Sequence, residues 1–343
     1  MDSINEEKSR KERGTRFFPH WTVRLKRALF LLLPLAIGGA FLPSFLNTYI
    51  IGSVLFLFAI YSVLALSYDI LGGFAGYMNL GHVVFFGIGA YVAAILFQKF
   101  SMPLALGISA APVAVACFAF LFSFPLFRLK GFYFAVAGLA FVELANLVVA
   151  SMNAASITNG FNGIAFVQYD VVVPYYAALA LVIFSILLSL VISDSKLGLA
   201  LRSIREDEEV AESIGINVPR VKRLALLLSG GIAGLDGAVY FWGRGEISPS
   251  TAFGFGIVFV PVTLALMGGT GTILGPILGG AIYIYLQYYG ISFLQSYVPG
   301  MIYFPNAVTG IILVIVGLFV PRGIVGSPRI RSLFRRLYAE MTE

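Results

Sequence analysis

Residues 194–223 read DSKLGLALRSIREDEEVAESIGINVPRVKR, and this charged stretch decides the fold because the chain on both sides of it is apolar. The flanking apolar runs cover residues 171–192 and 224–242. A charged segment between two runs that are long enough to cross a bilayer has to lie in water at the membrane surface. Residues 194–223 therefore predict a surface loop of a polytopic, all-α membrane protein.

Within this loop, apolar residues recur at intervals of three, four or seven, which predicts one short amphipathic helix. Its apolar side consists of Leu197, Leu201, Ile204, Ala211 and Ile214, and its charged side of Arg202, Arg205, Glu206, Glu209 and Glu212. Arg202 with Glu206, and Arg205 with Glu209, are spaced for i,i+4 ion pairs. Gly215 offers a left-handed stop, and Pro219 is predicted not to continue the helix. One side of the helix is free to dock a partner, although a solvated linker helix would show the same pattern.

The composition supports a membrane protein. Of 343 residues, 59% are hydrophobic and 12% are charged, whereas a soluble domain carries about 25% charged residues. Cys117 is the single cysteine, so an internal disulfide is excluded, and we expect no metal site. The glycine-rich residues 268–275, GGTGTILG, lack the Gly-Lys-Ser/Thr that grips nucleotide phosphates. If the protein uses ATP, another chain must hydrolyse it, and we expect no cofactor in this one.

A spanning helix needs about 20 apolar residues. The sequence offers ten candidate spans: 28–46, 49–71, 82–98, 103–127, 131–150, 171–193, 224–243, 254–267, 272–290 and 305–320. Residues 28–320 would then form the membrane domain, between a basic N-terminal tail, 1–27, and a basic C-terminal tail, 321–343.

The basic residues orient these spans. Eight precede the first span, two lie between the fourth and fifth, six lie in the loop 194–223, and five follow the tenth. With both termini cytoplasmic, 21 of the 23 Lys and Arg fall on the inner side, and only Lys99 and Arg244 lie outside. The loop 194–223 is therefore predicted to be cytoplasmic. Topology and anionic lipid account for the net charge of +6, so we expect no nucleic-acid partner.

Several polar features could serve a transport path. Glycines interrupt the apolar pattern at 72–81 and again at 268–280, which indicates either breaks in the helices or close helix packing, and a weak internal repeat. Ionisable residues within spans are functional candidates or hydrogen-bonded packing residues. They are Asp69, His82, Glu143 and Asp236. The outer loops 151–170 and 244–253 could receive a partner or simply connect spans.

Five segments in order resemble a known family. They are GFAGYMNLGHVVFFGIGAY, FPLFRLKGFYFAVAGLAFVEL (124–144), ITNGFNGI (157–164), the loop 194–223 and LALMGGTGTILGPILGGAIY, and PRGIVG at 321–326 also fits. Together they resemble permease subunits of branched-chain amino-acid ABC importers of the LivM type, from about residue 50 onward. The resemblance implies the ABC importer permease fold in the cytoplasmic membrane of a bacterium or archaeon.

The resemblance also implies partners. It implies a second, similar permease, two ATPase subunits that dock on the loop, and an extracytoplasmic substrate-binding protein. In this family a Glu-Ala-Ala-x-x-x-Gly pattern seats in the ATPase, and here Glu209-Val210-Ala211 precedes Gly215 at that spacing. Glu209, Ala211 and Gly215 are thus predicted coupling residues, with Arg202, Arg205 and Glu206 nearby.

Further site residues are predicted from position and polarity. For the translocation path we predict Tyr77, Asn79, His82, Glu143, Asn146 and Asp236, and for contact with the binding protein Asn159 and Asn162. Three positions depart from the family pattern: Asn79 replaces the usual Ser, Asp69 an Asn that is often found, and Asp236 lies in a segment that is normally uncharged.

Other functions stay open. Asp69 and Asp236 leave room for urea or a short-chain amide as the substrate, since the family includes urea permeases. An ion-coupled secondary transporter would work alone and depend on Glu143 or Asp236. A channel or a membrane scaffold would tolerate changes in the loop 194–223.

Overall fold

The computed structural model describes residue 32 and residues 36–151, 155–167, 170–290, 310–311, 314 and 323–326. The two tails, apart from 323–326, most of the predicted span 305–320 and part of 28–46 lie outside the described residues. Residues 36–41 are helical and continue into the 3-10 turn η2 (Leu42–Ser44). From Asn47 onward the chain forms a separate unit.

This unit is mostly helical, which confirms the helical class. The helices are α3 (Thr48–Ile50), α4 (Phe56–Gly72), α5 (Val83–Gln98), α6 (Leu104–Leu126), α7 (Gly131–Ala150), α8 (Ala155–Thr158), α9 (Val172–Asp194), α10 (Lys196–Glu206), α11 (Glu208–Ser213), α12 (Val218–Arg244), α13 (Pro249–Phe253), α14 (Phe255–Val258), α15 (Val260–Gly268), α16 (Leu274–Tyr285) and α19 (Gly323–Gly326). The π-helical segments η3 (Ile51–Leu55) and η5 (Leu286–Gly290) adjoin α4 and α16, and η4 (Gly160–Asn162) is a 3-10 turn.

Six helical segments among the described residues are long and apolar enough to cross a membrane. They are Thr48–Gly72, Leu104–Leu126, Gly131–Ala150, Val172–Asp194, Val218–Arg244 and Pro249–Gly268, with Val83–Gln98 as a shorter apolar helix. The predicted spans from 49–71 to 171–193 agree with these bounds to within about a residue, whereas the described part of 28–46 is helical only to residue 41. The total of ten spans and the cytoplasmic termini stay predictions.

Two predicted spans differ in detail. The span 224–243 begins earlier, at Val218, because Asn217 caps the helix by accepting a hydrogen bond from the Arg220 backbone N–H, and Pro219 occupies the first turn. Pro219 therefore starts a helix here. The span 254–267 belongs to a longer segment that glycine and proline divide into α13, α14 and α15.

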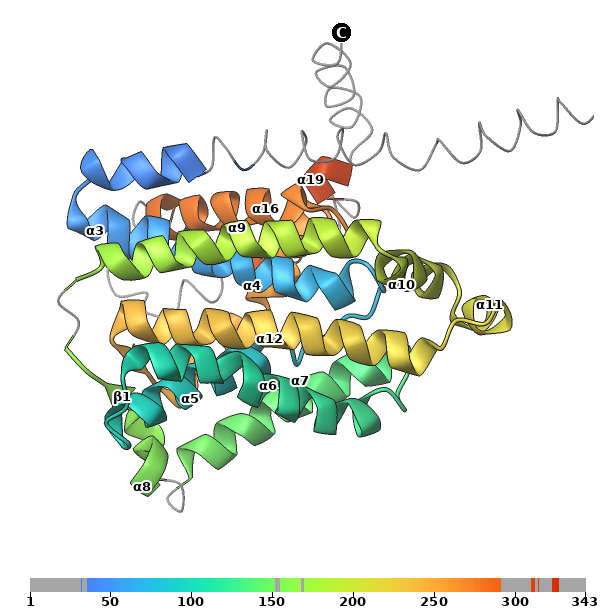
Figure 1. The fold of residues 1–343 in the computed structure, drawn as a ribbon, viewed down its shortest axis with the longest axis horizontal. Helices are drawn as coiled ribbons and strands as arrows, with labels where there is room; N and C mark the ends of the chain where they lie inside the picture. The colour runs from blue at the N-terminus through green and yellow to red at the C-terminus, as the bar shows by residue number, and fades with distance from the viewer. Residues whose placement is uncertain are drawn as a thin grey trace, which may run out of the picture. The chain divides into compact units, whose positions relative to one another are not determined.

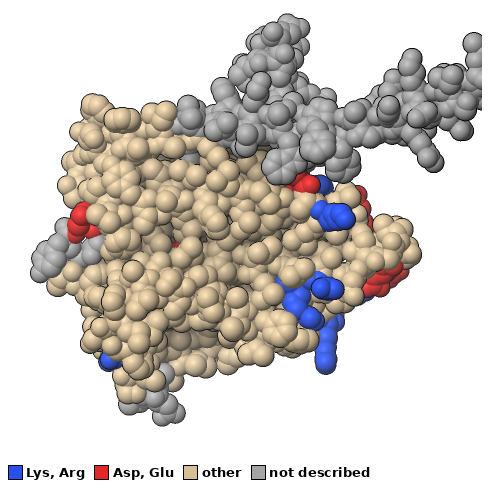
Figure 2. All heavy atoms as spheres, viewed as in Figure 1, with Lys and Arg blue, Asp and Glu red and all other residues tan. Residues whose placement is uncertain are grey.

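The loops collect at the two ends of this unit. Figure 1 shows α10 and α11 at one end and β1 at the other. At the β1 end, the two predicted outer loops are joined, because β1 (Ile164–Ala165) pairs antiparallel with β2 (Glu246–Ile247). Figure 2 shows Lys and Arg side chains gathered mainly at the end that carries α10 and α11. The basic side chains visible in this view thus gather at the same end as the loop 194–223.

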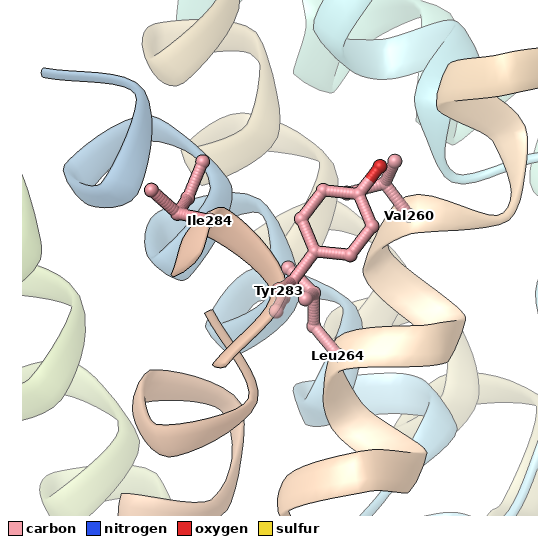
Figure 3. Close-up of a cluster of buried hydrophobic side chains, with 5 residues drawn as sticks. Val260, Leu264, Tyr283 and Ile284 are labelled. Atoms are coloured by element: carbon pink, nitrogen blue, oxygen red, sulfur yellow. The ribbon is translucent and has the colours of Figure 1, made fainter. Parts of the chain in front are cut away.

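Helix α12 lies in the middle of the bundle and packs against α4, α5, α6 and α9. Its closest approach to α5 depends on glycine. A Cβ added to Gly89 would lie 1.9 Å from the Gly234 carbonyl oxygen, and one added to Gly237 would lie 1.9 Å from the Phe86 carbonyl oxygen. Small residues thus let the two backbones touch. A second core joins α4, α15 and α16, where Tyr283 lies beside Val260 (Figure 3).

We predict that Gly89→Ala lowers the stability of the protein by about 2–3 kcal/mol, because the new methyl group overlaps a backbone carbonyl that cannot move aside. Gly231→Ala on α12 is the matched control, since the nearest atom to its added Cβ is 4.0 Å away. The apparent midpoint of thermal unfolding in mild detergent measures both. Equal midpoints for the two variants would contradict the close α5–α12 contact.

Candidate functional site

The loop 194–223 folds into two helices, so the prediction of one helix is wrong. Helix α10 ends at Glu206, and Asp207 is extended, with φ −160° and ψ 119°. The Asp207 carboxylate accepts hydrogen bonds from the backbone N–H groups of Glu209 and Val210, at 2.9 and 3.0 Å. A short acidic side chain that caps a new helix in this way competes with continuation of the previous one. The loop therefore turns a corner at Asp207.

The corner changes which residues face the protein. Leu201, Ile204 and Ala211, three members of the predicted apolar side, are buried, and Ile204 and Ala211 pack with Val218 at the start of α12. Ile214, in contrast, is 67% exposed, so it does not share one side with them as predicted. The backbone of Asp207 is not helical, so the helical spacing of α10 does not continue into α11.

The two predicted ion pairs of the loop are also absent from the described contacts. The Arg202 guanidinium donates to the Ser193 carbonyl at 2.9 Å. Arg205 donates from Nη1 to the carbonyl of Gly73, at 2.7 Å. Glu209 lies beyond the corner, in the next helix, so it does not stand at helical spacing from Arg205. Both arginines bind backbone carbonyls of other segments and thereby attach α10 to the bundle.

A partly buried clasp, which we define as Tyr77, Glu208 and Lys222, attaches the loop at its second helix. Lys222 Nζ donates to Glu208 Oε1 at 2.7 Å and to the Tyr77 hydroxyl at 2.9 Å, and that hydroxyl donates to Glu208 Oε2. The Lys222 side chain is only 2% exposed, and its Nζ lies 4.6 Å from the centroid of the Tyr77 ring. The clasp ties α11 to α12 and to the turn between α4 and α5.

The contacts within the clasp shift the pKa values of Glu208 and Tyr77. Burial alone would raise the pKa of the Glu208 carboxyl, but hydrogen bonds from Lys222 and Tyr77 outweigh burial and hold this pKa below its ordinary value. Burial and the bond to Glu208 raise the pKa of the Tyr77 phenol. At neutral pH the carboxylate is therefore ionised and the phenol keeps its proton to donate.

Lys222 and Glu208 were not among the predicted site residues. Lys222 was read only as one of the basic residues that orient the spans. A local signal existed, because Lys222 stands four residues after Val218 and three before Ala225, on the buried side of α12. Nothing local links it to Tyr77, which lies 145 residues away in the sequence.

The outer side of α11 is exposed and carries part of the predicted coupling pattern. Glu209 and Gly215 are exposed, as are Val210 (57%) and Ile214 (67%). Gly215 has φ +88°, and an added Cβ would meet nothing within 4 Å, so the backbone there is open to a partner. Glu206 and Arg202 are exposed on α10. Ala211 packs inward, which lets α11 lie close to the bundle.

The predicted path residues do not gather in one place. Tyr77 belongs to the clasp. Asn79 and His82 are buried in the turn between α4 and α5, where Asn79 Oδ1 accepts from the Gly81 N–H and His82 Nε2 lies 2.8 Å from the Ser67 hydroxyl. Asp236 is 0% exposed within α12, and its carboxylate oxygens have no hydrogen-bond partner among the described residues.

Glu143 and Asn146 lie on α7 instead. Glu143 is exposed and Asn146 is half-buried. The surrounding surface of α7 is apolar, with exposed Val136, Leu144, Leu147 and Val148. A carboxylate in the middle of an apolar, exposed helix surface is costly to leave in lipid. This surface of α7 is therefore suited to contact with another protein.

The two asparagines predicted for contact with the binding protein lie at the β1 end. Asn159 has a left-handed backbone, with φ +60°, and its Oδ1 accepts a hydrogen bond from Lys99 Nζ at 3.0 Å. Asn162 is exposed beside it, in η4. Lys99, one of the two basic residues predicted outside, thus holds the outer loop in place. No group of metal-ligating side chains occurs among the residues that the structure describes.

Comparison with known proteins identifies the family. Residues 49–320 match the family described as "Branched-chain amino acid transport system / permease component", so the chain belongs to this family of multi-pass membrane permeases. The chain is 29% identical over 283 residues to the high-affinity branched-chain amino acid transport system permease protein LivM of Escherichia coli (strain K12), covering 73% of this chain and 65% of LivM.

Two further relatives match over nearly their whole length. LivH of Escherichia coli (strain K12) is 25% identical over 327 residues, and BraD of Pseudomonas aeruginosa is 23% identical over 321, each covering 85% of this chain and 98% of the relative. Both carry the same title as high-affinity branched-chain amino acid transport system permease proteins. This chain spans about two thirds of LivM but almost all of LivH and BraD. No solved structure matches the chain.

We predict that Lys222→Met loosens the loop 194–223, because it leaves the partly buried Glu208 carboxylate without its cation. Losing hydrogen bonds to a charged group costs about 1.5–3 kcal/mol, so the loop should be cleaved about tenfold faster or more by a protease specific for glutamate. Lys196→Met is the matched control, since Lys196 is exposed on α10. Equal cleavage rates for the two variants would show that the clasp does not hold the loop.

Proposed function

We propose that this chain is the transmembrane permease subunit of an ATP-driven ABC importer for the branched-chain amino acids leucine, isoleucine and valine. Membership of the permease family and the names of the relatives LivM, LivH and BraD support this substrate class. The multi-pass chain would lie in the cytoplasmic membrane of a bacterium or archaeon, with both termini and the loop 194–223 inside.

The observation that carries the proposal is the construction of α11. Its outer side presents two large apolar side chains, Val210 and Ile214, beside a glycine with an open backbone. Its inner side is fixed by the clasp, which links it to α12 and to the turn between α4 and α5. A rigidly attached helix with an uncovered apolar tip is suited to receive a force from a second protein and pass it to the spans.

The partner at this tip would be an ATPase, one of two in the complex. The sequence has no loop that grips nucleotide phosphates, so ATP would be hydrolysed by those separate chains. Glu209, Arg202 and Glu206 are exposed near the tip and would set the register of docking by their charges. Substrate would then pass by alternating access, with ATP binding favouring one state and release of products the other.

A second, similar permease would cover the exposed surface of α7. Glu143 supports this arrangement, because an uncovered carboxylate at that depth would face lipid. The path would lie between the two permeases, with Glu143 and Asn146 at its wall. At the opposite end from α11, a substrate-binding protein would dock on the outer loops near Asn159 and Asn162.

We predict that Ile214→Arg abolishes co-purification of the ATPases from native membranes in mild detergent, because a charge replaces the apolar tip. Phe161→Arg is the matched control: Phe161 is 78% exposed, but it lies in η4 on the outer loop. It should keep the ATPases and weaken only the binding protein's contact. If the ATPases are missing from the wild-type preparation, or remain bound to Ile214→Arg, the proposed docking is wrong.

Uptake by the same complex in proteoliposomes identifies the substrate. Leucine uptake that requires ATP and the binding protein is the expected result. Uptake of urea in place of leucine would move the chain to another substrate within the family. Uptake driven by an ion gradient without ATPases would contradict the importer proposal.

A further inference from the structure

Two glycine-rich turns from distant parts of the chain touch each other beside α10. The first turn, residues 73–82, joins α4 to α5, and the second, residues 269–273, joins α15 to α16. Asp69, buried in the last turn of α4, accepts hydrogen bonds from the Gly271 N–H at both carboxylate oxygens, at 2.9 and 3.0 Å. A Cβ added to Gly73 would lie 2.6 Å from the Gly271 nitrogen. We call these segments the paired turns.

Arg205 of α10 lies against both of the paired turns. Its Nη1 donates to the Gly73 carbonyl at 2.7 Å, in the first turn. A Cβ added to Gly271, in the second turn, would lie 2.8 Å from the same Nη1. A Cβ added to Gly76 would lie 3.0 Å from Arg205 Cγ. Glycine at positions 76 and 271 lets the arginine approach the backbone itself.

Two glycines of the paired turns have a left-handed backbone. Gly76 and Gly271 both have φ +74°, a conformation that favours glycine. The guanidinium also carries the charge that faces the buried Asp69 carboxylate. Because these contacts are to backbone groups, a shift of the exposed Arg205 side chain would act directly on the backbone of the turns.

We propose that Arg205 is the positioning residue that carries movement of α10 and α11 into both paired turns at once. This inference rests on the proposed function, in which ATPases move the loop 194–223. The clasp reaches only the first turn, through Tyr77. Arg205 reaches the second turn as well and so links the loop to the α15–α16 pair. Moving the α4–α5 pair and the α15–α16 pair together at their cytoplasmic ends would open or close the cytoplasmic end of the translocation path.

The first test compares Arg205→Gln with Lys196→Gln in the complete complex, reconstituted in proteoliposomes. Lys196 is the matched control because it is an exposed cation on the same helix, α10, and has no part in the proposed docking. The readout is radiolabelled leucine transported per ATP hydrolysed. We expect this ratio to fall at least tenfold in Arg205→Gln, with the ATPases still bound, and to stay within twofold of wild type in Lys196→Gln. Equal ratios in both variants would overturn the proposal.

A second variant separates positioning from charge compensation. Asp69→Asn removes the buried charge but keeps an oxygen that can accept from the Gly271 N–H. If Arg205 only neutralises Asp69, the double variant Asp69→Asn/Arg205→Gln regains the wild-type ratio, and the proposal fails. If Arg205 positions the turns, the double variant regains thermal stability while its ratio stays low.

A third measurement needs no transported substrate. Met78 lies in the first turn and is 49% exposed, so Met78→Cys in a Cys117→Ser chain can be labelled with a water-soluble maleimide. We expect ATP with vanadate to change the labelling rate at least threefold when Arg205 is present and to have no effect in Arg205→Gln. The proposal would be overturned if nucleotide still changed the labelling rate in Arg205→Gln. It would also be overturned if nucleotide had no effect on the protein that retains Arg205. Absence of bound ATPases would instead refute the proposed function, on which the proposal rests.

Discussion

The ion pair between Lys222 and Glu208 holds a charged loop against an apolar helix bundle, and the function proposed for the chain depends on it. A loop that is soluble in water has little tendency to stay fixed on a membrane domain. Here a buried ammonium, a carboxylate and the Tyr77 phenol satisfy one another, so the loop is attached without leaving an unpaired charge inside. Removing one member therefore destabilises the attachment of the loop more than expected for a residue of a charged surface loop.

Glycine has a related role in the bundle and at its inner end. Between α5 and α12, glycines allow two backbones to meet, which fixes the central helix among its neighbours. At the paired turns, glycines allow Arg205 and Asp69 to reach backbone groups of a distant segment. The loop, the two turns and the central helix are thus joined by short polar contacts on a rigid support.

The sequence was sufficient for the features that depend on local pattern. Hydrophobic runs located α6, α7 and α9 to within about a residue, and the charge pattern located the loop between α9 and α12. The corner at Asp207 was missed, because helical periodicity was extended through a residue whose side chain caps a new helix. The early start of α12 was missed because Pro219 was read as a stop.

The coupling contacts could not be found in this way. Arg205 and Gly73 are 132 residues apart, and Asp69 and Gly271 are 202 apart, so no local spacing joins them. The two glycine clusters were recognised as related, but their meeting in space depends on how the helix pairs pack. Tyr77 was assigned to the path by polarity, and the structure shows that it contacts the loop. The residues predicted for the translocation path from their polarity alone therefore lie in several separate parts of the structure.

If ATPases act on this permease through the tip of α11, an ATPase lies against that tip in the assembled complex. The most direct test is photo-crosslinking in whole cells, with a photoreactive phenylalanine at Val210, which is exposed on that tip, and at Phe161 for comparison. We expect an adduct with an ATP-binding cassette protein from position 210 and none from position 161. Adducts with such a protein from position 161, or only with lipid from position 210, would contradict it.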